Sequence, residues 1–184
     1  MYIESERLVL RDFQLADVSD LFEILGDAET MRHVEPPFTP EKTRRFLEGF
    51  CIAKKGAFAA VETGSGKVVG YILFNSVSGN GVYEIGWVFN RSYWGNGYAY
   101  EICSKLLEFA FCEMGSHKVF AETIDKHKSV RLMRKLGMKR EGIQRKHERD
   151  CNGEWADLYY YGILKEEFMR KVKRNQRLKN LRRK

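Results

Sequence analysis

The sequence predicts a single α/β domain over residues 1–184, with a mixed, mostly antiparallel sheet of about seven strands flanked by about four helices. Three observations lead to this prediction. Short apolar runs typical of strands alternate with amphipathic runs typical of helices. The length of 184 residues, with 43% hydrophobic and 31% charged residues, suits one globular domain. A helical run separates the apolar runs 82–89 and 117–124, which predicts a parallel β–α–β connection.

The N-terminal part of the chain predicts one strand and two helices. Residues 6–13 alternate apolar and polar side chains and form the strand. Asp17 is expected to N-cap the first helix. The apolar face of that helix comprises Val18, Leu21, Phe22 and Leu25. Thr39, with Pro40 at the first helical position, is expected to start a second helix that runs to about Ala53.

Turn signals divide the middle of the chain into strands. Residues 56–62 and 67–77 flank the turn TGSG and predict a hairpin. The turn GNG then leads into the strand over residues 82–89. A helix follows and is expected to end near Glu113.

The last part of the chain predicts three strands, one short helix and a basic end. The strands are residues 117–124, 138–150 and 154–164. Ser129 is expected to cap the helix and Gly137 to stop it. Asn152-Gly153 is a strong hairpin signal between the last two strands.

Positive charge is concentrated at the C-terminal end. Residues 165–184 hold ten Lys or Arg and two acids, whereas residues 1–164 hold 22 Lys or Arg and 23 acids. The net charge of +7 therefore belongs to a basic C-terminal helix or tail, and the body lacks a nucleic-acid-binding footprint. The tail has three alternative roles: a solvated helix surface, electrostatic guidance toward a ribosome or acidic protein, or direct RNA contact.

The apolar runs, the N-terminus and the cysteines further narrow the class of protein. No apolar run approaches the roughly 20 residues that span a bilayer, and the N-terminus lacks the segments of a signal peptide. The cysteines are Cys51, Cys103, Cys112 and Cys151. Their wide spacing predicts reduced thiols, with neither a zinc site nor a disulfide framework. We therefore expect a cytoplasmic protein without membrane contact or metal.

The segment NRSYWGNGYAYE, residues 90–101, joins a predicted strand to a predicted helix. Gly95 and Gly97 flank one polar residue at the join. A Gly-x-Gly turn that opens into a helix presents unpaired backbone N–H groups and the positive end of the helix dipole. The segment matches neither GxGxxG nor GxxxxGK[ST], so its own residues indicate either an anion cradle or an ordinary strand-to-helix turn.

Four segments together resemble the GNAT superfamily of acetyl-CoA-dependent N-acetyltransferases. They are ESERLVLRDFQLADVSDLFEIL, EIGWVFNRSYWGNGYAYE, DKHKSVRLMRKLGMKREG and NGEWADLYYYGIL. In this order they are most similar to the branch that includes bacterial ribosomal-protein N-terminal acetyltransferases. The resemblance covers nearly the whole chain and implies the α+β type of fold, with a parallel strand pair that splays at the cofactor site.

The resemblance implies an acetyl-CoA site at the Gly-x-Gly turn, where the family binds pyrophosphate through backbone amides. The corresponding residues are Gly95, Asn96, Gly97, Tyr98 and Ala99. Trp94 stands where the superfamily often has Arg or Gln, which leaves recognition to the backbone. Val88 and Phe89 correspond to the strand that pairs with the pantetheine arm. Ser129 and Lys126 occupy two further cofactor positions, and Lys126 replaces an Asn that many members carry.

Acetyl transfer to an amine needs a base for the amine, a donor for the oxyanion and a group that stabilises the departing thiolate. Met133 replaces a general-acid Tyr of many family members and cannot donate a proton. Ser129 is then the candidate donor to the thiolate. Glu84 and Glu148 are the candidate bases, although each could be an ordinary solvated carboxylate. We favour Glu84, because the basic neighbours of Glu148 would lower its pKa and weaken it as a base. Glu148 is then either a second base or a ligand for the substrate ammonium.

The resemblance implies direct attack by a neutral primary amine within a ternary complex. The first candidate acceptor is the N-terminal α-amine of a protein such as a ribosomal protein. Small amines (polyamine, amino acid or aminoglycoside) are the second class. A CoA-binding or ribosome-docking protein without catalysis is the contrary class, motivated by the missing Tyr and Asn. The expected partners are acetyl-CoA and the acceptor, with nucleic acid contact only through the basic tail, in a monomer or homodimer.

Overall fold

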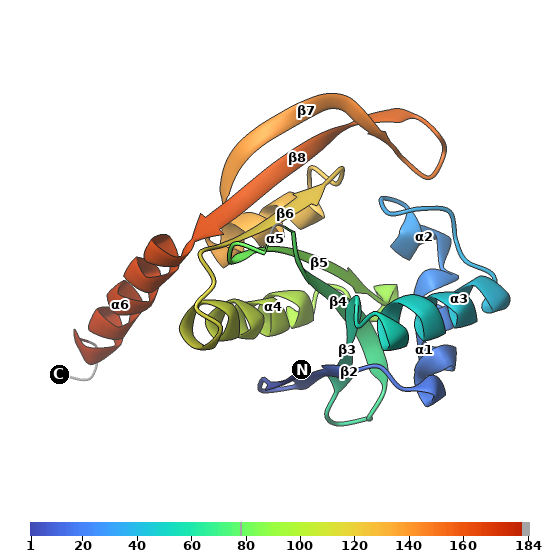
Figure 1. Ribbon diagram of the computed structural model, residues 1–184, viewed down its shortest axis with the longest axis horizontal. Helices are drawn as coiled ribbons and strands as arrows, with labels where there is room; N and C mark the ends of the chain where they lie inside the picture. Colours follow the sequence, from blue (N-terminus) through green and yellow to red (C-terminus); the bar gives the residue numbers. More distant parts are fainter. Residues whose placement is uncertain (78, 182–184) are drawn as a thin grey trace.

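The computed structural model describes residues 1–77 and 79–181, with side chains up to residue 176 in the last helix. Its centre is one eight-stranded sheet in the order β1-β2-β3-β4-β5-β6-β8-β7 (Figure 1). The strands are β1 (Tyr2–Glu4), β2 (Leu8–Asp12), β3 (Ala57–Glu62), β4 (Val68–Ser76), β5 (Val82–Phe89), β6 (Lys118–Thr123), β7 (Lys139–Arg149) and β8 (Trp155–Leu164). Among the strands of the described residues, only β5 and β6 run parallel. The predicted mixed sheet is confirmed with one strand more, because β1 is too short to show an alternating pattern.

Six α-helices lie in the described part of the chain, two more than the sequence predicts. They are α1 (Val18–Leu25), α2 (Ala28–Met31), α3 (Pro40–Phe46), α4 (Tyr98–Glu108), α5 (Lys128–Leu136) and α6 (Lys165–Leu181). Helix α2 is a single turn, too short to show a helical period. Helices α3 and α4 continue as wider π-helical turns over Leu47–Ala53 and Phe109–Glu113, so both end where the sequence predicts.

The sheet separates two apolar cores. The core on one face is formed with α4 and α5 and includes Ile85 and Phe89 of β5. The core on the other face is formed with α1 and α3 and includes Val88. Because successive side chains of a strand point to opposite faces, Glu84 lies on the same face as Val88. This face, beyond the cover of α1 to α3, carries the candidate acceptor side.

Helix α1 buries a slightly different face from the predicted one. Leu21, Ile24 and Leu25 are fully buried, whereas the predicted core residue Phe22 is 37% exposed. The Phe22 ring instead lies over Gly26, which ends the helix.

The two predicted caps near the N-terminus have different outcomes. The hydroxyl of Thr39 accepts the N–H of Lys42 at 3.2 Å, which confirms the cap of α3. Asp17 precedes α1 but does not cap it through its side chain. Its carboxylate instead binds both Nη atoms of Arg11 at 2.8 Å and accepts the N–H of Gln14.

The basic C-terminal segment forms α6, which follows β8 directly and extends away from the body (Figure 1). The buried ring of Phe168 lies 5.0 Å from that of Phe111, centroid to centroid. The ammonium of Lys171 donates to the carbonyl oxygen of Leu136 at 2.9 Å, in the last turn of α5. The start of α6 is therefore packed on the body, and residues 182–184 of the predicted tail lie outside the described residues.

The described residues contain no helix long and apolar enough to cross a membrane and no cluster arranged to hold a metal ion. Cys51 and Cys103 are buried free thiols. Burial raises the pKa of Cys51 to about 12 and raises that of Cys103 as well. Neither thiol is therefore suited to act as a nucleophile.

Candidate active site

Strands β5 and β6 run side by side for only three residues and then separate. Their register pairs Val82 with Lys118, Tyr83 with Val119 and Glu84 with Phe120. Strand β5 continues to Phe89, paired on its other side with β4. Within the described residues, the backbone of β5 after Glu84 therefore has no strand partner on the β6 side. The predicted splay of the parallel pair is confirmed, and it opens at Glu84.

The turn between β5 and α4 presents a row of unpaired amides. Gly95 and Gly97 both have φ of +80°, a left-handed conformation that favours glycine. The first hydrogen bond of α4 runs from the N–H of Glu101 to the carbonyl of Gly97. In the part of the chain that the structure describes, six consecutive N–H groups before it, from Gly95 to Tyr100, have no acceptor. They include the five of the predicted pyrophosphate site, which belong to Gly95, Asn96, Gly97, Tyr98 and Ala99. Such a row at a helix N-terminus fits a pyrophosphate.

Trp94 anchors this turn to the end of β5. Its indole N–H donates to the carbonyl oxygen of Phe89 at 2.8 Å. The ammonium of Lys128, in the first turn of α5, lies 3.9 Å from the centroid of its ring. The indole N–H is thereby occupied within the protein, so the side chain of Trp94 holds the turn and the amides remain the free donors.

Helix α5 is capped by Asp125 and not, as the sequence predicts, by Ser129. The carboxylate of Asp125 accepts the backbone N–H groups of His127, Lys128 and Ser129 at 2.9, 3.0 and 3.0 Å. Ser129 is the second residue of the helix, and its hydroxyl donates to Asp125 at 3.3 Å. Burial acts to raise the pKa of Asp125, but these backbone hydrogen bonds outweigh it and lower the pKa. A charged carboxylate is the stronger acceptor, which explains why it displaces serine as the cap.

The Ser129 hydroxyl is half-buried beside this cap, and Lys126 lies exposed just before the helix. Ser129 has one hydroxyl proton, which the long bond to Asp125 uses. Donation to a departing thiolate therefore requires the hydroxyl to rotate away from Asp125. Met133, four residues further along the helix, is fully buried in the core.

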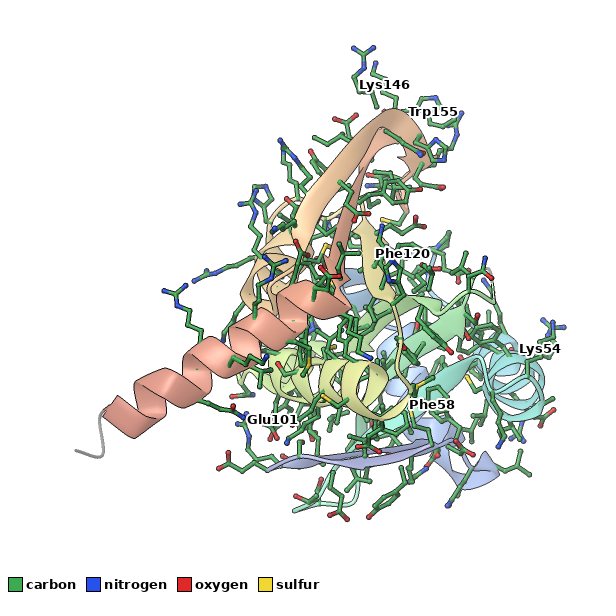
Figure 2. All side chains as sticks on the ribbon, turned by 60° about the vertical axis from the view of Figure 1, so that its left-hand side comes forward. Lys54, Phe58, Glu101, Phe120, Lys146 and Trp155 are labelled. Atoms are coloured by element: carbon green, nitrogen blue, oxygen red, sulfur yellow. The ribbon has the colours of Figure 1, made fainter. Side chains whose placement is uncertain are left out.

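Glu84 is half-buried at the apex of the opening. Burial, and then the charge of Glu122, raises its pKa. Glu122 lies on β6, two residues beyond the partner of Glu84, which is the Phe120 labelled in Figure 2. Glu122 is in turn paired with Tyr160 of β8. Because strand partners share a face and positions two apart share it too, all three polar side chains lie on the same face.

Glu148 joins this face from β7. It is paired with Ala156 of β8, and Tyr160 lies four residues further along the same strand. Burial raises the pKa of Tyr160, and the neighbouring Glu122 carboxylate and the charges of Glu148 and Glu84 add to the effect. Three carboxylates and one phenol therefore gather beyond the splay. We refer to Glu84, Glu122, Glu148 and Tyr160 as the carboxylate face.

Sequence reasoning identifies Glu84 and Glu148 and misses Glu122 and Tyr160. The available signal is alternation: Glu122 is the polar residue two positions after Phe120 in a predicted strand. Tyr160, within the run YYY, carries no such signal. Only the register between β6 and β8 places its hydroxyl side among the carboxylates.

Comparisons with known proteins match this architecture. The family model of the acetyltransferase (GNAT) domain matches residues 7–139. A Bacillus subtilis (strain 168) protein named as the uncharacterized N-acetyltransferase YnaD is 36% identical over 170 residues, covering 91% of this chain and 99% of that protein. The crystal structure of a GNAT-family acetyltransferase from Bacillus anthracis is 37% identical with a TM-score of 0.83, covering 90% of this chain and 99% of that chain.

A more distant solved structure shows the same fold. It is RimL, a ribosomal-protein α-N-acetyltransferase in complex with coenzyme A. It is 19% identical with a TM-score of 0.77, over 89% of this chain and 98% of that chain.

Proposed function

The chain belongs to the acetyltransferase (GNAT) family, and on this premise we propose that it transfers acetyl from acetyl-CoA to the N-terminal α-amine of a protein, such as a ribosomal protein. The observation that carries the proposal is the separation of β5 and β6 directly beyond Glu84. It leaves two strand edges that can each pair with an extended chain, and they meet at a half-buried carboxylate.

The β5 edge and the Gly-x-Gly turn form the donor side of the proposal. Backbone groups of Val88 and Phe89 suit the amides of the pantetheine arm. The unpaired N–H groups of residues 95–99 suit the pyrophosphate. Lys126 lies exposed at the start of α5, where its ammonium suits a CoA phosphate.

The β6 edge forms the acceptor side. Beyond Phe120, the strand pairs among the described residues with β8 on one side only, which leaves its other side for an extended peptide. A peptide along this edge brings its α-amine toward Glu84 and the carboxylate face. Carboxylates there stabilise the ammonium form on arrival, and Glu148 is suited to that role.

In the proposed step, the side chain of Glu84 accepts a proton from the ammonium and the neutral nitrogen attacks the thioester carbonyl carbon. The new C–N bond forms, the C–S bond breaks and the electron pair leaves with sulfur. The nitrogen then loses its second proton, which ends on the departing sulfur and gives the free thiol of CoA. A raised pKa suits a carboxylate to this proton transfer, because it brings the pKa of the base closer to neutral pH. Ser129 is the proposed donor to the departing thiolate.

A small polyamine is the second candidate acceptor. The observation that favours it is the gathering of Glu122 and Glu148 near Glu84, which gives the acceptor side more negative charge than one ammonium needs. The proposed location for either reaction is the cytoplasm, whose reducing conditions suit the free cysteines.

An acceptor panel tests the proposal. The panel contains peptides with free or formylated N-termini, spermidine, amino acids and an aminoglycoside, with products identified by mass spectrometry. We expect transfer to free peptide N-termini and none to the formylated peptides, even where these contain lysine. A higher kcat/KM for spermidine would favour the second candidate. Tight acetyl-CoA binding without transfer to any amine would contradict both.

A further inference from the structure

We infer that Arg7 and Glu101 are positioning residues for acetyl-CoA, which hold the turn over residues 95–99 in the geometry that binds pyrophosphate. The inference rests on the proposed function, because it takes this turn as the cofactor site. Both residues lie behind the turn and act through its backbone. Figure 2 labels Glu101 on α4, at the side of that helix that faces β1 and β2.

The carboxylate of Glu101 is bound on all sides by the short segment between β1 and β2. Its Oε1 accepts the Ser5 hydroxyl at 2.8 Å and the backbone N–H of Arg7 at 2.7 Å. Its Oε2 accepts the Nε and Nη2 of Arg7 at 2.8 and 2.7 Å. Both guanidinium nitrogens donate to the same oxygen, and these charge-assisted hydrogen bonds are stronger than bonds between neutral groups. They fix the first turn of α4 relative to the sheet.

Arg7 also reaches the turn itself. Its Nη2 donates to the carbonyl oxygen of Asn96 at 2.9 Å. The carbonyl of Asn96 and the N–H of Gly97 belong to one planar trans peptide and point in opposite directions. Binding the carbonyl from behind therefore aims the N–H of Gly97 outward, toward the proposed pyrophosphate.

A second contact fixes the next residue. The guanidinium of Arg7 lies 4.5 Å from the ring centroid of Tyr98, whose hydroxyl donates to Glu62 at 2.6 Å. Tyr98 is the first residue of α4, so its backbone N–H is part of the cradle. Arg7 thereby restrains two of the five amides, through the carbonyl of Asn96 and through the Tyr98 ring.

Charge gives Arg7 a second effect on the cofactor. The hydrogen bond to Glu101 raises the pKa of Arg7. Burial acts to raise the pKa of Glu101, but hydrogen bonds from Arg7 and Ser5 lower it, so both partners are charged. Removal of Arg7 alone would leave an uncompensated carboxylate one helical turn from the pyrophosphate. Removal of both charges would not, so the double variant should bind acetyl-CoA better than the Arg7 single variant.

The pair of Arg11 and Asp17 provides a matched control. It also joins β2 to a helical segment through two contacts of 2.8 Å, but it does not touch the turn. We expect Arg7→Gln to raise the Kd for acetyl-CoA by on the order of 10-fold in isothermal titration, the size typical of losing a supporting contact. Arg11→Gln should lower Tm comparably and leave the Kd unchanged. Arg7→Gln/Glu101→Gln should recover part of the affinity.

Three outcomes separate the inference from the proposed function. Equal increases in Kd for Arg7→Gln and Arg11→Gln, or unchanged affinity in Arg7→Gln, would overturn the inference alone. Unchanged affinity in Gly97→Glu would show that acetyl-CoA binds elsewhere and would overturn the proposed site. If Arg7→Gln does not fold, Glu101→Gln is measured in its place, with the same expected weakening.

Discussion

Glu84 on β5 shares one face of the sheet with Glu122 on β6, and burial together with the charge of Glu122 raises the pKa of Glu84. The relationship follows from the register, because Phe120 is the partner of Glu84 and Glu122 shares its face. The carboxylate at the apex of the splay thereby has a higher pKa than an ordinary glutamate, which makes it a better proton acceptor. Glu84→Gln should lower kcat by roughly 10² to 10⁴-fold, the usual contribution of a general base. Steady-state kinetics with a saturating acceptor measures this, and Glu148→Gln should lower kcat much less.

The pH profile should depend on Glu122. If Glu84 is the base, activity should fall at low pH as Glu84 becomes protonated, and its raised pKa should place this fall at higher pH than for an ordinary carboxylate. Glu122→Gln removes the neighbouring negative charge and lowers the pKa of Glu84. The acid limb of kcat/KM should therefore move to lower pH, while Glu148→Gln leaves it in place. An acid limb that Glu122→Gln does not move would exclude this coupling.

Glu84→Gln should raise the stability of the fold at neutral pH although it lowers activity. The folded protein raises the pKa of Glu84, so its stabilising effect is present below the unfolded pKa and lost as pH rises through the folded pKa. At neutral pH the charged, half-buried form opposes folding, and glutamine removes this cost. Thermal unfolding should show a higher Tm for Glu84→Gln at neutral pH, with the difference shrinking under acid conditions. A lower Tm at neutral pH would count against the burial argument.

Substitution of Asp125 should lower stability, whereas substitution of Ser129 should change activity alone. Because Asp125 caps α5 through three backbone N–H groups, Asp125→Ala should destabilise the fold by about 1–2 kcal/mol. That contribution is lost as pH falls through the lowered pKa of Asp125. Ser129→Ala keeps the cap, so chemical denaturation should find little change in stability. A fall in kcat in this stable variant would support Ser129 as the thiolate donor, and an unchanged kcat would refute that role.

Gly97 should be essential for acetyl-CoA binding, because a side chain there would fill the anion site and strain the backbone. Gly97→Glu places a carboxylate among the free amides of the turn and strains a residue with φ of +80°. Gly153, in the β7–β8 turn, has φ of +81° and open space around it, so Gly153→Glu imposes similar strain elsewhere. Isothermal titration should show loss of acetyl-CoA binding in Gly97→Glu only. Equal losses in both variants would assign the effect to strain.

Local patterns predict much of this fold. Apolar runs, alternation and turn signals identify seven of the eight strands, and Thr39 with Pro40 marks a helix start that the structure contains. The Gly-x-Gly turn is also predictable, because backbone with positive φ favours glycine and the two glycines stand out in the sequence. Strand β1 has only three residues, too few for a period to emerge.

Contacts between distant segments account for what the sequence does not predict. Arg7 and Glu101 are 94 residues apart, and no local sequence pattern around either residue predicts their contact. Tyr160 reaches the carboxylate face only through the register of β6 with β8. The cap of α5 is also not predictable from the sequence, although both candidates lie close together in it. Asp125 and Ser129 are both residue types that cap helices, and only the folded structure shows that the Asp125 carboxylate accepts the N–H groups.

The backbone amides of the turn are proposed to bind the pyrophosphate of acetyl-CoA. Amide resonances of ¹⁵N-labelled protein, followed during titration with acetyl-CoA and separately with S-acetylpantetheine, test it directly. Acetyl-CoA should shift the amides of Gly95, Asn96, Gly97, Tyr98 and Ala99, and S-acetylpantetheine, which lacks pyrophosphate, should leave them in place. Saturation with acetyl-CoA without movement of these five resonances would contradict the claim.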